Sequence, residues 1–387
     1  MTSPLRIFIS APVYERAQSF GGPVEMFINI AAGLAARGHD VDVFTTSLIG
    51  LGAGRSLESS VESVDGVRVH YLATPVRFRW MGITPTLPFQ LERATRPDIV
   101  HVFGFRDPIG SGVATWCRAR GVPYVFEGLG MVTPKHRKVA LKRVLDSTVL
   151  RGVLGGARLL VANSSVEVSD YRDAGFPGRR IVVRPNGFPE AGAKVERGRL
   201  RELVGLGEET PLVLSVGRIA RGKGFDLLVQ AAAELPGAHV AIVGPDGGHG
   251  VTGELVALRD RLGLADRVHL VGALPRSELP SVYADADVFV LASSYESFGL
   301  VVAEAAAAGA AIVVTDRCGV ADLFADSGAV VIPYGEAPLR GALLHLLEDA
   351  ALRSRLRDEA REVARAWSWE RVVELQEDYY VQALGDG

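Results

Sequence analysis

The chain has 387 residues, a length that predicts two domains. Hydrophobic residues make up 48% of it and the net charge is −3, so large buried cores are expected and a general attraction to nucleic acid is not. The two cysteines, Cys117 and Cys318, fall in different halves, which argues against a disulfide and favours a cytoplasmic location. The start, MTSPLRIFIS, lacks the pattern of a signal peptide, and the most apolar window, 299–314, is too short to span a bilayer.

The first half alternates short apolar runs with helical stretches, which predicts a parallel sheet with helices on both faces. A first helix is expected from Pro23 to Arg37, because proline suits the first helical position and Gly38 suits the end. A second is expected near 109–120. The predicted strands are 5–10, 41–45, 67–72, 98–103, 123–127, 158–163 and 181–186. Residues 187–209 are rich in Gly, Glu and Arg without a long apolar run, so the linker is predicted there.

The second half restarts the same alternation and ends in a helical tail from about residue 338, with Trp367 and Trp369 near a turn. Its predicted strands are 212–216, 240–243, 268–271, 288–291, 311–314 and 330–332. The predicted fold class is therefore α/β, with two doubly wound, Rossmann-like domains at 1–190 and 191–370 that face a central cleft. In such sheets, ligands bind beyond the carboxyl ends of the strands.

The stretch SSYESFGLVVAEAAAAGAA, residues 293–311, carries two acids between two predicted strands. Glu296 lies in a loop, and Glu304 lies about 9 Å along a helix predicted at 298–308, which Gly309 ends. The free N–H groups at the start of this helix lie between the acids and would bind phosphate. They belong to Phe298, Gly299 and Leu300. A nucleoside diphosphate sugar has the shape that such a site requires, although Glu304 can also be an ordinary helix residue, solvated or buried with partners.

Other polar residues and glycines follow neighbouring strands of the second domain. Gly217, Arg218 and Lys223 lie in the loop after 212–216, where both cations could turn toward one anion. They can equally be solvated loop residues. Leu274 lies in a turn after 268–271 that could offer backbone groups to a nucleobase. Asp285 and Asp287 resemble a metal-binding Asp-x-Asp motif, but they precede a strand, which is the wrong end for a site, so no metal site is predicted.

Two further segments allow either a functional or an ordinary interpretation. Gly22 follows Gly21 before a helix and is a candidate for binding an anion. Glu25, in the first turn of that helix, can either contribute to a site or only complement the helix dipole. Residues 134–158 are strongly basic. They form either an ordinary surface helix or a contact with an anionic membrane at the inner face of the plasma membrane.

Taken in order, these motifs resemble the retaining glycosyltransferases of family 4, which have the GT-B fold. The resemblance rests on an ordered set of sequence pieces that spans nearly the whole chain. The pieces are GGPVE at 21–25, NS at 163–164, PNG at 185–187, VGR at 216–218 with KG at 223–224, IVG at 242–244, VG at 271–272 and ESFGLVVAE at 296–304.

The resemblance implies roles for individual residues. Arg218 and Lys223 would hold the donor diphosphate and stabilise the charge of the leaving nucleotide. Glu304 would bind the ribose, and Glu296 would bind the donor sugar. Gly22 would approach the donor from the first domain. The family acts on an acceptor hydroxyl with retention and without a metal or other cofactor, and its last helix, here about 371–387, crosses back to the first domain.

The chain departs from the family at one position. Many members carry a His after the strand that is 123–127 here, whereas this chain reads Glu127-Gly-Leu-Gly130. A carboxylate differs from an imidazole in charge and donors, so the role of that His does not transfer to Glu127. Glu127, Gly130, His101 and Glu25 are candidates for the acceptor side, which would take a sugar, a lipid-linked or a small-molecule acceptor.

Two alternatives remain at this stage. A sugar-nucleotide epimerase can share the same architecture and would need no acceptor, and a non-catalytic relative would keep the fold alone. The joint presence of Arg218, Lys223, Glu296 and Glu304 argues against the second. A Rossmann dehydrogenase is disfavoured because no GxGxxG follows the first strand. The donor base, UDP or GDP, stays open.

Overall fold

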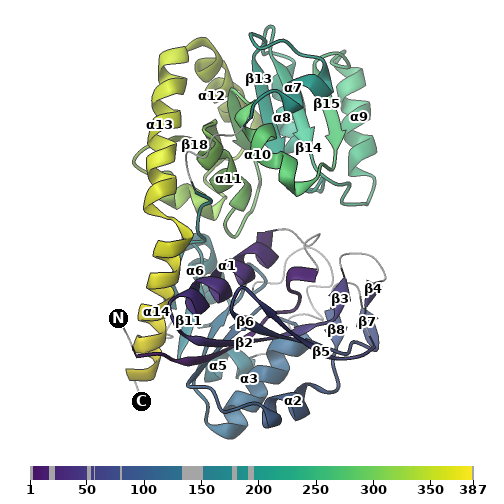
Figure 1. The fold of residues 1–387 in the computed structure, drawn as a ribbon. Coiled ribbons are helices and arrows are strands. Elements are labelled where there is room, and N and C mark those ends of the chain that lie inside the picture. Colours follow the sequence, from purple (N-terminus) through teal and green to yellow (C-terminus); the bar gives the residue numbers. More distant parts are fainter. Residues whose placement is uncertain are drawn as a thin grey trace. The chain divides into compact units, whose positions relative to one another are not determined.

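The computed structural model forms two compact units (Figure 1). It describes residues 3–16, 22–49, 54–55, 57–78, 81–132, 151–176, 181–190 and 196–385. Unit 1 comprises 1–186 and 369–387, and unit 2 comprises 187–368. The sequence analysis placed these boundaries at 190/191 and 370/371. The chain passes between the units twice, because its last helix, α14 (Trp369–Gly385), belongs to unit 1.

Unit 1 contains an eight-stranded sheet of order β12-β11-β10-β9-β1-β2-β6-β5, which is parallel except for the edge strand β5. Its strands are β1 (Arg6–Ser10), β2 (Asp40–Thr46), β5 (Ser60–Val64), β6 (Val67–Leu72), β9 (Ile99–Phe103), β10 (Tyr124–Glu127), β11 (Leu159–Ala162) and β12 (Ile181–Val183). Two antiparallel hairpins accompany it, β3 (Leu48–Ile49) with β4 (Gly54–Arg55) and β7 (Val76–Phe78) with β8 (Met81–Ile83).

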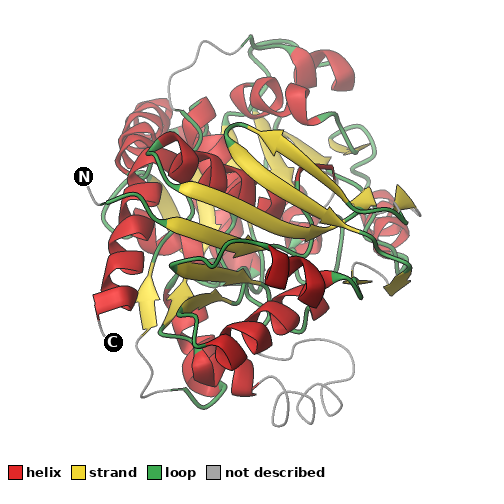
Figure 2. Ribbon diagram, turned by 60° about the horizontal axis from the view of Figure 1, so that its bottom comes forward, coloured by secondary structure: helices red, strands yellow, loops and turns green. Residues whose placement is uncertain are grey.

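Helices cover both faces of this sheet, as Figure 2 shows. The helices of unit 1 besides α14 are α1 (Gly22–Ala36), α2 (Leu87–Arg93), α3 (Pro108–Arg120), α5 (Arg151–Gly156) and α6 (Ser165–Asp173). Alternation along β9 divides the core: Phe103 contacts Phe27 of α1, whereas Val102 packs in a cluster with Val113 of α3. Asp107 caps α3 by accepting from the N–H of Gly110, which fixes where this helix begins.

Unit 2 contains a parallel six-stranded sheet of order β15-β14-β13-β16-β17-β18. Its strands are β13 (Leu212–Val216), β14 (His239–Val243), β15 (Val268–Gly272), β16 (Val288–Leu291), β17 (Ala311–Thr315) and β18 (Ala329–Ile332). Numbered within the unit, this order is 3-2-1-4-5-6, the order of a dinucleotide-binding doubly wound fold. The order of strands reverses between β13 and β16, so the loops that leave these two strands define the topological switch point.

Two layers of helices enclose the second sheet. One face packs against α8 (Phe225–Ala232), α9 (Val251–Arg261) and α12 (Glu336–Glu348). The other packs against α10 (Leu279–Ala284), α11 (Leu300–Ala308), α13 (Ala350–Ala366) and the 3-10 turn η4 (Gly319–Phe324). Helix α7 (Arg199–Val204) and the 3-10 turn η3 (Arg276–Glu278) complete the unit. In the ranges that the structure describes, every helix is too short or too polar to cross a bilayer.

The strands predicted from apolar runs are confirmed, with bounds that shift by up to three residues. The linker predicted at 187–209 is wrong in part, because 199–204 form α7 and its Leu200 is buried in the core of unit 2. The helix predicted at 298–308 begins instead at Leu300, since Gly299 takes a left-handed φ of 113°. Most of the basic segment 134–158 lies outside the described residues, and only 151–156 are seen as helix α5.

A cluster of polar contacts fastens α14 to the turn between α1 and β2. Glu377 of α14 binds Nε of Arg37 at 2.5 Å and Nε2 of His39 at 2.6 Å. The backbone N–H of Leu5 donates to Nδ1 of His39 at 3.0 Å, so the ring donates to Glu377 through Nε2. Burial alone would raise the pKa of Glu377, but the bonds from His39 and Arg37 lower it below its ordinary value.

This contact makes the stability of unit 1 sensitive to acid. The pKa of Glu377 is lower in the folded protein than in the unfolded chain. The contribution of this residue to the unfolding free energy is therefore fully present above the pKa of the unfolded chain, and it is lost as the pH falls through the pKa of the folded protein. We expect Glu377→Gln to reduce the acid-dependent loss of unfolding free energy between pH 7 and pH 3 by about 1–2 kcal/mol. Urea unfolding of the wild type and of the variant at pH 7 and pH 3 measures this difference in free energy. Glu374→Gln, at a more exposed and longer pair with Arg37, is the control; an equal effect there would contradict the assignment.

Candidate donor site

The loops that leave β13 and β16 are packed against each other at the switch point of unit 2. The backbone N–H of Ser294 donates to the carbonyl of Gly222 at 2.8 Å. Gly224 has a φ of 72°, and a Cβ placed on it would lie 1.9 Å from the carbonyl oxygen of Ala292. Only glycine allows this approach. The sequence pattern Arg-Gly-Lys-Gly at 221–224 therefore brings Lys223 close to the loop that carries Glu296.

Lys223 and Glu296 form an ion pair through Nζ and Oε1, and both side chains remain partly exposed. The backbone of Glu296 is held on both sides, because its N–H donates to Arg317 at 3.1 Å and its carbonyl accepts from Gly319 at 3.1 Å. The hydroxyl of Ser293 lies 3.5 Å from the same carboxylate oxygen. The structure thus brings together Lys223 and Glu296, two of the candidate site residues from the sequence analysis. Their charged groups are partly exposed to solvent, on loops whose backbones are held by hydrogen bonds.

Arg218 lies in the same loop as Lys223 but has a different environment. Its side chain is exposed, and within the described ranges it has no hydrogen bond or ion pair, so no contact joins it to Lys223 or Glu296. The neighbouring backbone is fixed by bonds from Ile219 to Pro245 and from Gly247 to Ile219, both 2.9 Å. Its guanidinium group is therefore open to an anion from solution. Gly217, at the end of β13, donates to the carbonyl of Val243 at 2.9 Å.

Helix α11 begins at the same edge of the sheet. Phe298 is buried in the core. Gly299 has a left-handed φ, and a Cβ placed on it would lie only 2.8 Å from the side chain of Leu291. These two residues therefore fix the point at which the chain enters the helix. The N–H groups of the first turn have no partner within a helix, and they carry the positive end of its dipole. Glu304 lies four residues after Leu300, about 6 Å along the axis.

Glu304 is held by two side chains that the sequence analysis missed. The hydroxyl of Tyr283 in α10 donates to Oε2 at 2.5 Å, and Arg276 in η3 lies 3.4 Å from Oε1. Burial raises the pKa of Glu304, although Tyr283 and Arg276 act in the opposite direction. Arg276 could have been found, because it follows Leu274 in the turn after β15. Leu274 itself is partly buried against the core of unit 2.

Two of the candidates for the acceptor side are fully buried in unit 1. His101 lies in the middle of β9, where Nδ1 contacts the hydroxyl of Tyr380 at 2.8 Å. Glu127 ends β10 and forms an ion pair with Arg184, which is also fully buried. Desolvation by burial lowers the pKa of His101, although Glu127 raises it.

Gly130 lies in a tightly held turn after β10. It has a φ of 68°, and Leu129 before it is also left-handed at 55°, an uncommon conformation for leucine. Glu167 of α6, which sequence reasoning missed, accepts from the N–H of Gly130 at 2.6 Å. Burial raises the pKa of Glu167 to about 7. Gly22 is the first residue of α1, and the carbonyl of Glu25 accepts from the side chain of Asn29.

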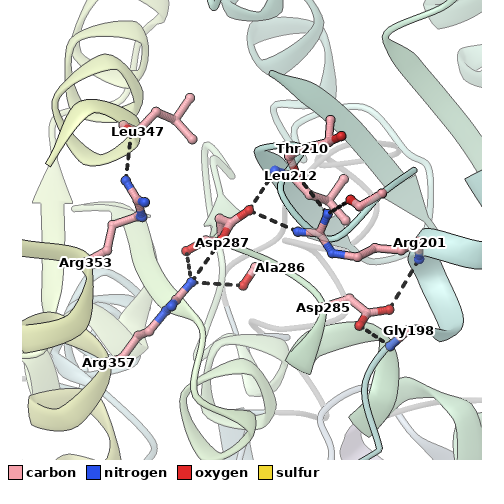
Figure 3. A network of polar contacts seen from close by, with 11 residues as sticks. Gly198, Arg201, Thr210, Leu212, Asp285, Ala286, Asp287, Leu347, Arg353 and Arg357 are labelled. Carbon is pink, nitrogen blue, oxygen red and sulfur yellow. Dashed lines mark hydrogen bonds and ion pairs between the residues drawn. The ribbon is translucent and has the colours of Figure 1, made fainter. Parts of the chain in front are cut away.

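Asp285 and Asp287 are engaged in a structural network rather than open to a metal, as Figure 3 shows. Buried Asp285 accepts from the backbone N–H groups of Gly198, Leu200 and Arg201 at the start of α7. Asp287 pairs with Arg201 at 3.1 Å and Arg357 at 3.4 Å. Within the described residues, no group of three or more His, Cys, Asp or Glu is arranged to hold a metal ion.

Comparisons with known proteins match both units. Residues 196–363 match the family described as glycosyl transferases group 1, and residues 21–187 match the glycosyl transferase 4-like domain. D-inositol 3-phosphate glycosyltransferases from Xylanimonas cellulosilytica and Mycobacteroides abscessus are each 32% identical. The first alignment covers 94% of this chain and 92% of the relative, and the second covers 95% and 85%.

Solved structures show the same fold at low identity. Sucrose-phosphate synthase from Thermosynechococcus elongatus has a TM-score of 0.79 at 23% identity, over 99% of this chain and all of that one. HepE of Anabaena, in complex with UDP and glucose, has a TM-score of 0.76 at 18% identity, over 98% and 100%. These matches confirm the GT-B fold predicted from the ordered motifs. The chain therefore belongs to the group 1 glycosyltransferases, enzymes that carry two Rossmann-like domains, as its resemblance to family 4 implied.

Proposed function

We propose that the protein transfers a hexosyl group from a nucleoside diphosphate sugar to an acceptor hydroxyl with retention of anomeric configuration. The observation that carries this proposal is the Lys223–Glu296 pair at the switch point of unit 2, beside the start of α11. A partly exposed cation and anion side by side match a ligand that carries phosphate next to a polyhydroxylated ring. The family membership of the chain supports the same reaction.

In this proposal, the diphosphate draws Lys223 away from Glu296 and lies between Lys223, the exposed Arg218 and the N–H groups of Gly299 and Leu300. The two cations stabilise the negative charge that develops on the leaving nucleotide. Glu304 accepts from the ribose hydroxyls, and Tyr283 and Arg276 hold its carboxylate in place.

The released Glu296 would bind hydroxyls of the donor sugar and stabilise the positive charge that develops on its ring. We propose that the acceptor attacks the same face that the leaving group departs from, and that the leaving phosphate takes the acceptor proton. The anomeric configuration of the first product, read by nuclear magnetic resonance before mutarotation, tests this proposal. An inverted product would contradict it.

A binding screen followed by an acceptor screen tests the function as a whole. UDP sugars come first, because HepE is described in complex with UDP and glucose, and GDP and ADP sugars follow. D-inositol 3-phosphate is the first acceptor to try, because the relatives are named for it. A donor should raise the melting temperature by mass action, and release of the nucleoside diphosphate should require an acceptor. Acceptor-independent release of an epimerised sugar would point to an epimerase instead.

The proposed phosphate contacts predict the effect of removing either cation. We expect Arg218→Ala and Lys223→Ala each to weaken binding of the nucleoside diphosphate by about tenfold, because each removes a charge-assisted bond. Isothermal titration calorimetry measures this change. Arg221→Ala is the control, since Arg221 lies in the same loop but pairs with Glu254. Equal affinity in all four proteins would remove the phosphate assignment.

We further propose that the reaction needs no metal or other cofactor. Both acids of the Asp285 and Asp287 motif are used by backbone N–H groups and arginines, and Arg218 with Lys223 can supply positive charge at the diphosphate. We expect transfer to continue at its full rate in excess EDTA. Loss of activity with EDTA and its return with added Mg²⁺ would contradict the proposal.

We also propose a cytoplasmic location with peripheral contact to an anionic membrane through the basic segment 134–158. The free state of Cys117 and Cys318 and the charge of the segment support it. Residues 133–150 lie outside the described part of the chain, so the support for this segment is its sequence.

A further inference from the structure

The loop that carries Glu296 extends past the end of the second sheet and is held on two sides. We call residues 292–299, between β16 and α11, the Glu296 loop. On one side, the N–H of Ser294 is bonded to the loop after β13. On the other side, the Glu296 loop runs beside residues 317–320, where an isolated parallel bridge pairs Glu296 with Cys318. This second contact continues the pairing of β16 with β17 beyond the last residue of each strand.

Backbone hydrogen bonds form the first part of this second contact. The N–H of Glu296 donates to Arg317 at 3.1 Å, and its carbonyl accepts from Gly319 at 3.1 Å. Further along, the N–H of Val320 donates to the carbonyl of Phe298 at 2.9 Å. These bonds fix the path of the main chain, but they use only backbone groups. They therefore do not explain which side chains the loop needs.

One buried side chain adds to these bonds at the start of the loop. Thr315, the last residue of β17, donates its hydroxyl proton to the carbonyl of Ser293 at 2.7 Å, and both residues are at most 1% exposed. Ser293 lies two residues past the end of β16, and a buried carbonyl without a partner is costly. The hydroxyl of Thr315 therefore supplies a bond at a point that the sheet no longer reaches.

The thiol of Cys318 meets the same two groups. Its Sγ lies 3.3 Å from Oγ1 of Thr315 and 4.0 Å from the carbonyl oxygen of Ser293. The single hydroxyl proton of Thr315 is already used on that carbonyl, so the thiol is the donor between the two side chains. Burial raises the pKa of the thiol to about 12, which keeps its proton in place near neutral pH. Cys318 thus directs the hydroxyl proton of Thr315 toward Ser293.

Ser293 connects this buried bond to the carboxylate of Glu296. The hydroxyl of Ser293 lies 3.5 Å from Oε1 of Glu296, the same oxygen that pairs with Lys223. The next residue, Ser294, is the one that is bonded to the loop after β13. A shift of the carbonyl of Ser293 would therefore move the segment that sets the position of the carboxylate.

We propose that Thr315 is a positioning residue for Glu296, and that its bond to Ser293 holds the Glu296 loop where the carboxylate meets the donor sugar. Thr315 is buried, so it acts only through the loop and takes no direct part in the reaction. The inference rests on the proposed function, because that proposal places Glu296 at the sugar. The position of the carboxylate matters for the rate, since an error of about 1 Å at a reacting centre can cost roughly 10²-fold.

Thr315→Val tests this inference, because valine keeps the shape of threonine and lacks the hydroxyl. We expect kcat of the full-length protein with UDP-glucose, or with the donor that the binding screen selects, to fall by at least about tenfold. The dissociation constant of the matching nucleoside diphosphate should change by less than about twofold, since its contacts remain. Thr315→Ser keeps the donor and should restore most of the rate. Ser215→Ala is the control, because it removes a similarly buried bond, to the carbonyl of Val290, from inside the sheet.

A second background shows whether Thr315 acts through Glu296. In a protein that already carries Glu296→Gln, Thr315→Val should lower the rate further by less than about twofold. A full additional tenfold loss there would mean that Thr315 supports another part of the site, and it would overturn the inference. A merely structural role would lower the melting temperature and would reduce the rate equally in both backgrounds.

Hydrogen exchange separates this inference from the proposed reaction, because it needs no substrate. In Thr315→Val, the amides of residues 293–299 should exchange at least about tenfold faster than in the wild type, while those of β13 stay protected. Wild-type exchange in this segment would overturn the inference, and so would an unchanged kcat. Faster exchange in a protein that transfers no sugar counts against the proposed function alone.

Discussion

Glu296→Gln should lower the rate of sugar transfer by about 10²–10³-fold while nucleoside diphosphate binds no more weakly than to the wild type. The amide keeps the shape and part of the hydrogen bonding of the carboxylate but loses the charge that stabilises a positive sugar ring. In the structure, Glu296 pairs with Lys223, so the amide also leaves Lys223 free for phosphate. Steady-state kinetics and calorimetry measure the two effects separately.

Glu254→Gln is a suitable control for this result. Glu254 also forms an ion pair with a residue of the loop after β13, Arg221, but both side chains of this pair are well exposed. We expect its turnover to stay within a factor of about two, because exposed ion pairs contribute little. Full activity of Glu296→Gln would remove Glu296 from the mechanism, and an equal loss in both variants would show that the loop itself had been disturbed.

Arg184→Met should destabilise unit 1 by about 3–5 kcal/mol, because it leaves the carboxylate of Glu127 buried without its ionic partner. Both side chains of this pair are fully buried. Within the described residues, Oε1 of Glu127 and both Nε and Nη1 of Arg184 have no hydrogen-bond partner. The buried polar atoms of the pair thus have too few hydrogen-bond partners, and the loss of one member adds the free-energy cost of an unpaired buried charge. Equilibrium unfolding in urea, monitored by tryptophan fluorescence, measures the change.

The double variant Glu127→Leu, Arg184→Met separates charge burial from loss of packing. We expect it to regain most of the lost stability, since two apolar side chains of similar size remove both desolvated charges together. Arg371→Met, which breaks an exposed pair with Glu374, should change stability by less than about 0.5 kcal/mol. A double variant as unstable as Arg184→Met would mean that packing around these residues, rather than charge, decides the effect.

Most of the parallel strands were predictable because they are buried on both faces and therefore appear in the sequence as continuous apolar runs. The run VFVL at β16 and the run AIVV at β17 are both of this kind. The strand order 3-2-1-4-5-6 then brings the ends of β13 and β16 together, so the contact between Lys223 and Glu296 follows from local motifs and topology. The roles of these residues, and those of Arg218 and Glu304, stay predictions.

The missed features depend on contacts that no short sequence pattern encodes. The hairpins β3–β4 and β7–β8 have strands of only two or three residues, too short to show a period. Tyr283 and Glu304 are 21 residues apart, and Glu127 and Arg184 are 57 apart, so their pairing appears only once the helices and strands are packed. Helix α7 was hidden in the predicted linker because the carboxylate that accepts from its first N–H groups, that of Asp285, lies 85 residues away from Leu200.

The last helix has a consequence for the order in which the protein is made. Unit 2 is one continuous piece of chain, residues 187–368, whereas unit 1 is completed only by α14, which follows unit 2 in the sequence. Tyr380, Val372 and Val373 of α14 are buried, so nascent unit 1 exposes the apolar surface that they will cover until α14 has left the ribosome. Residues 1–186 are therefore synthesised before unit 2 but can reach their native state only after unit 2 and α14 have been made.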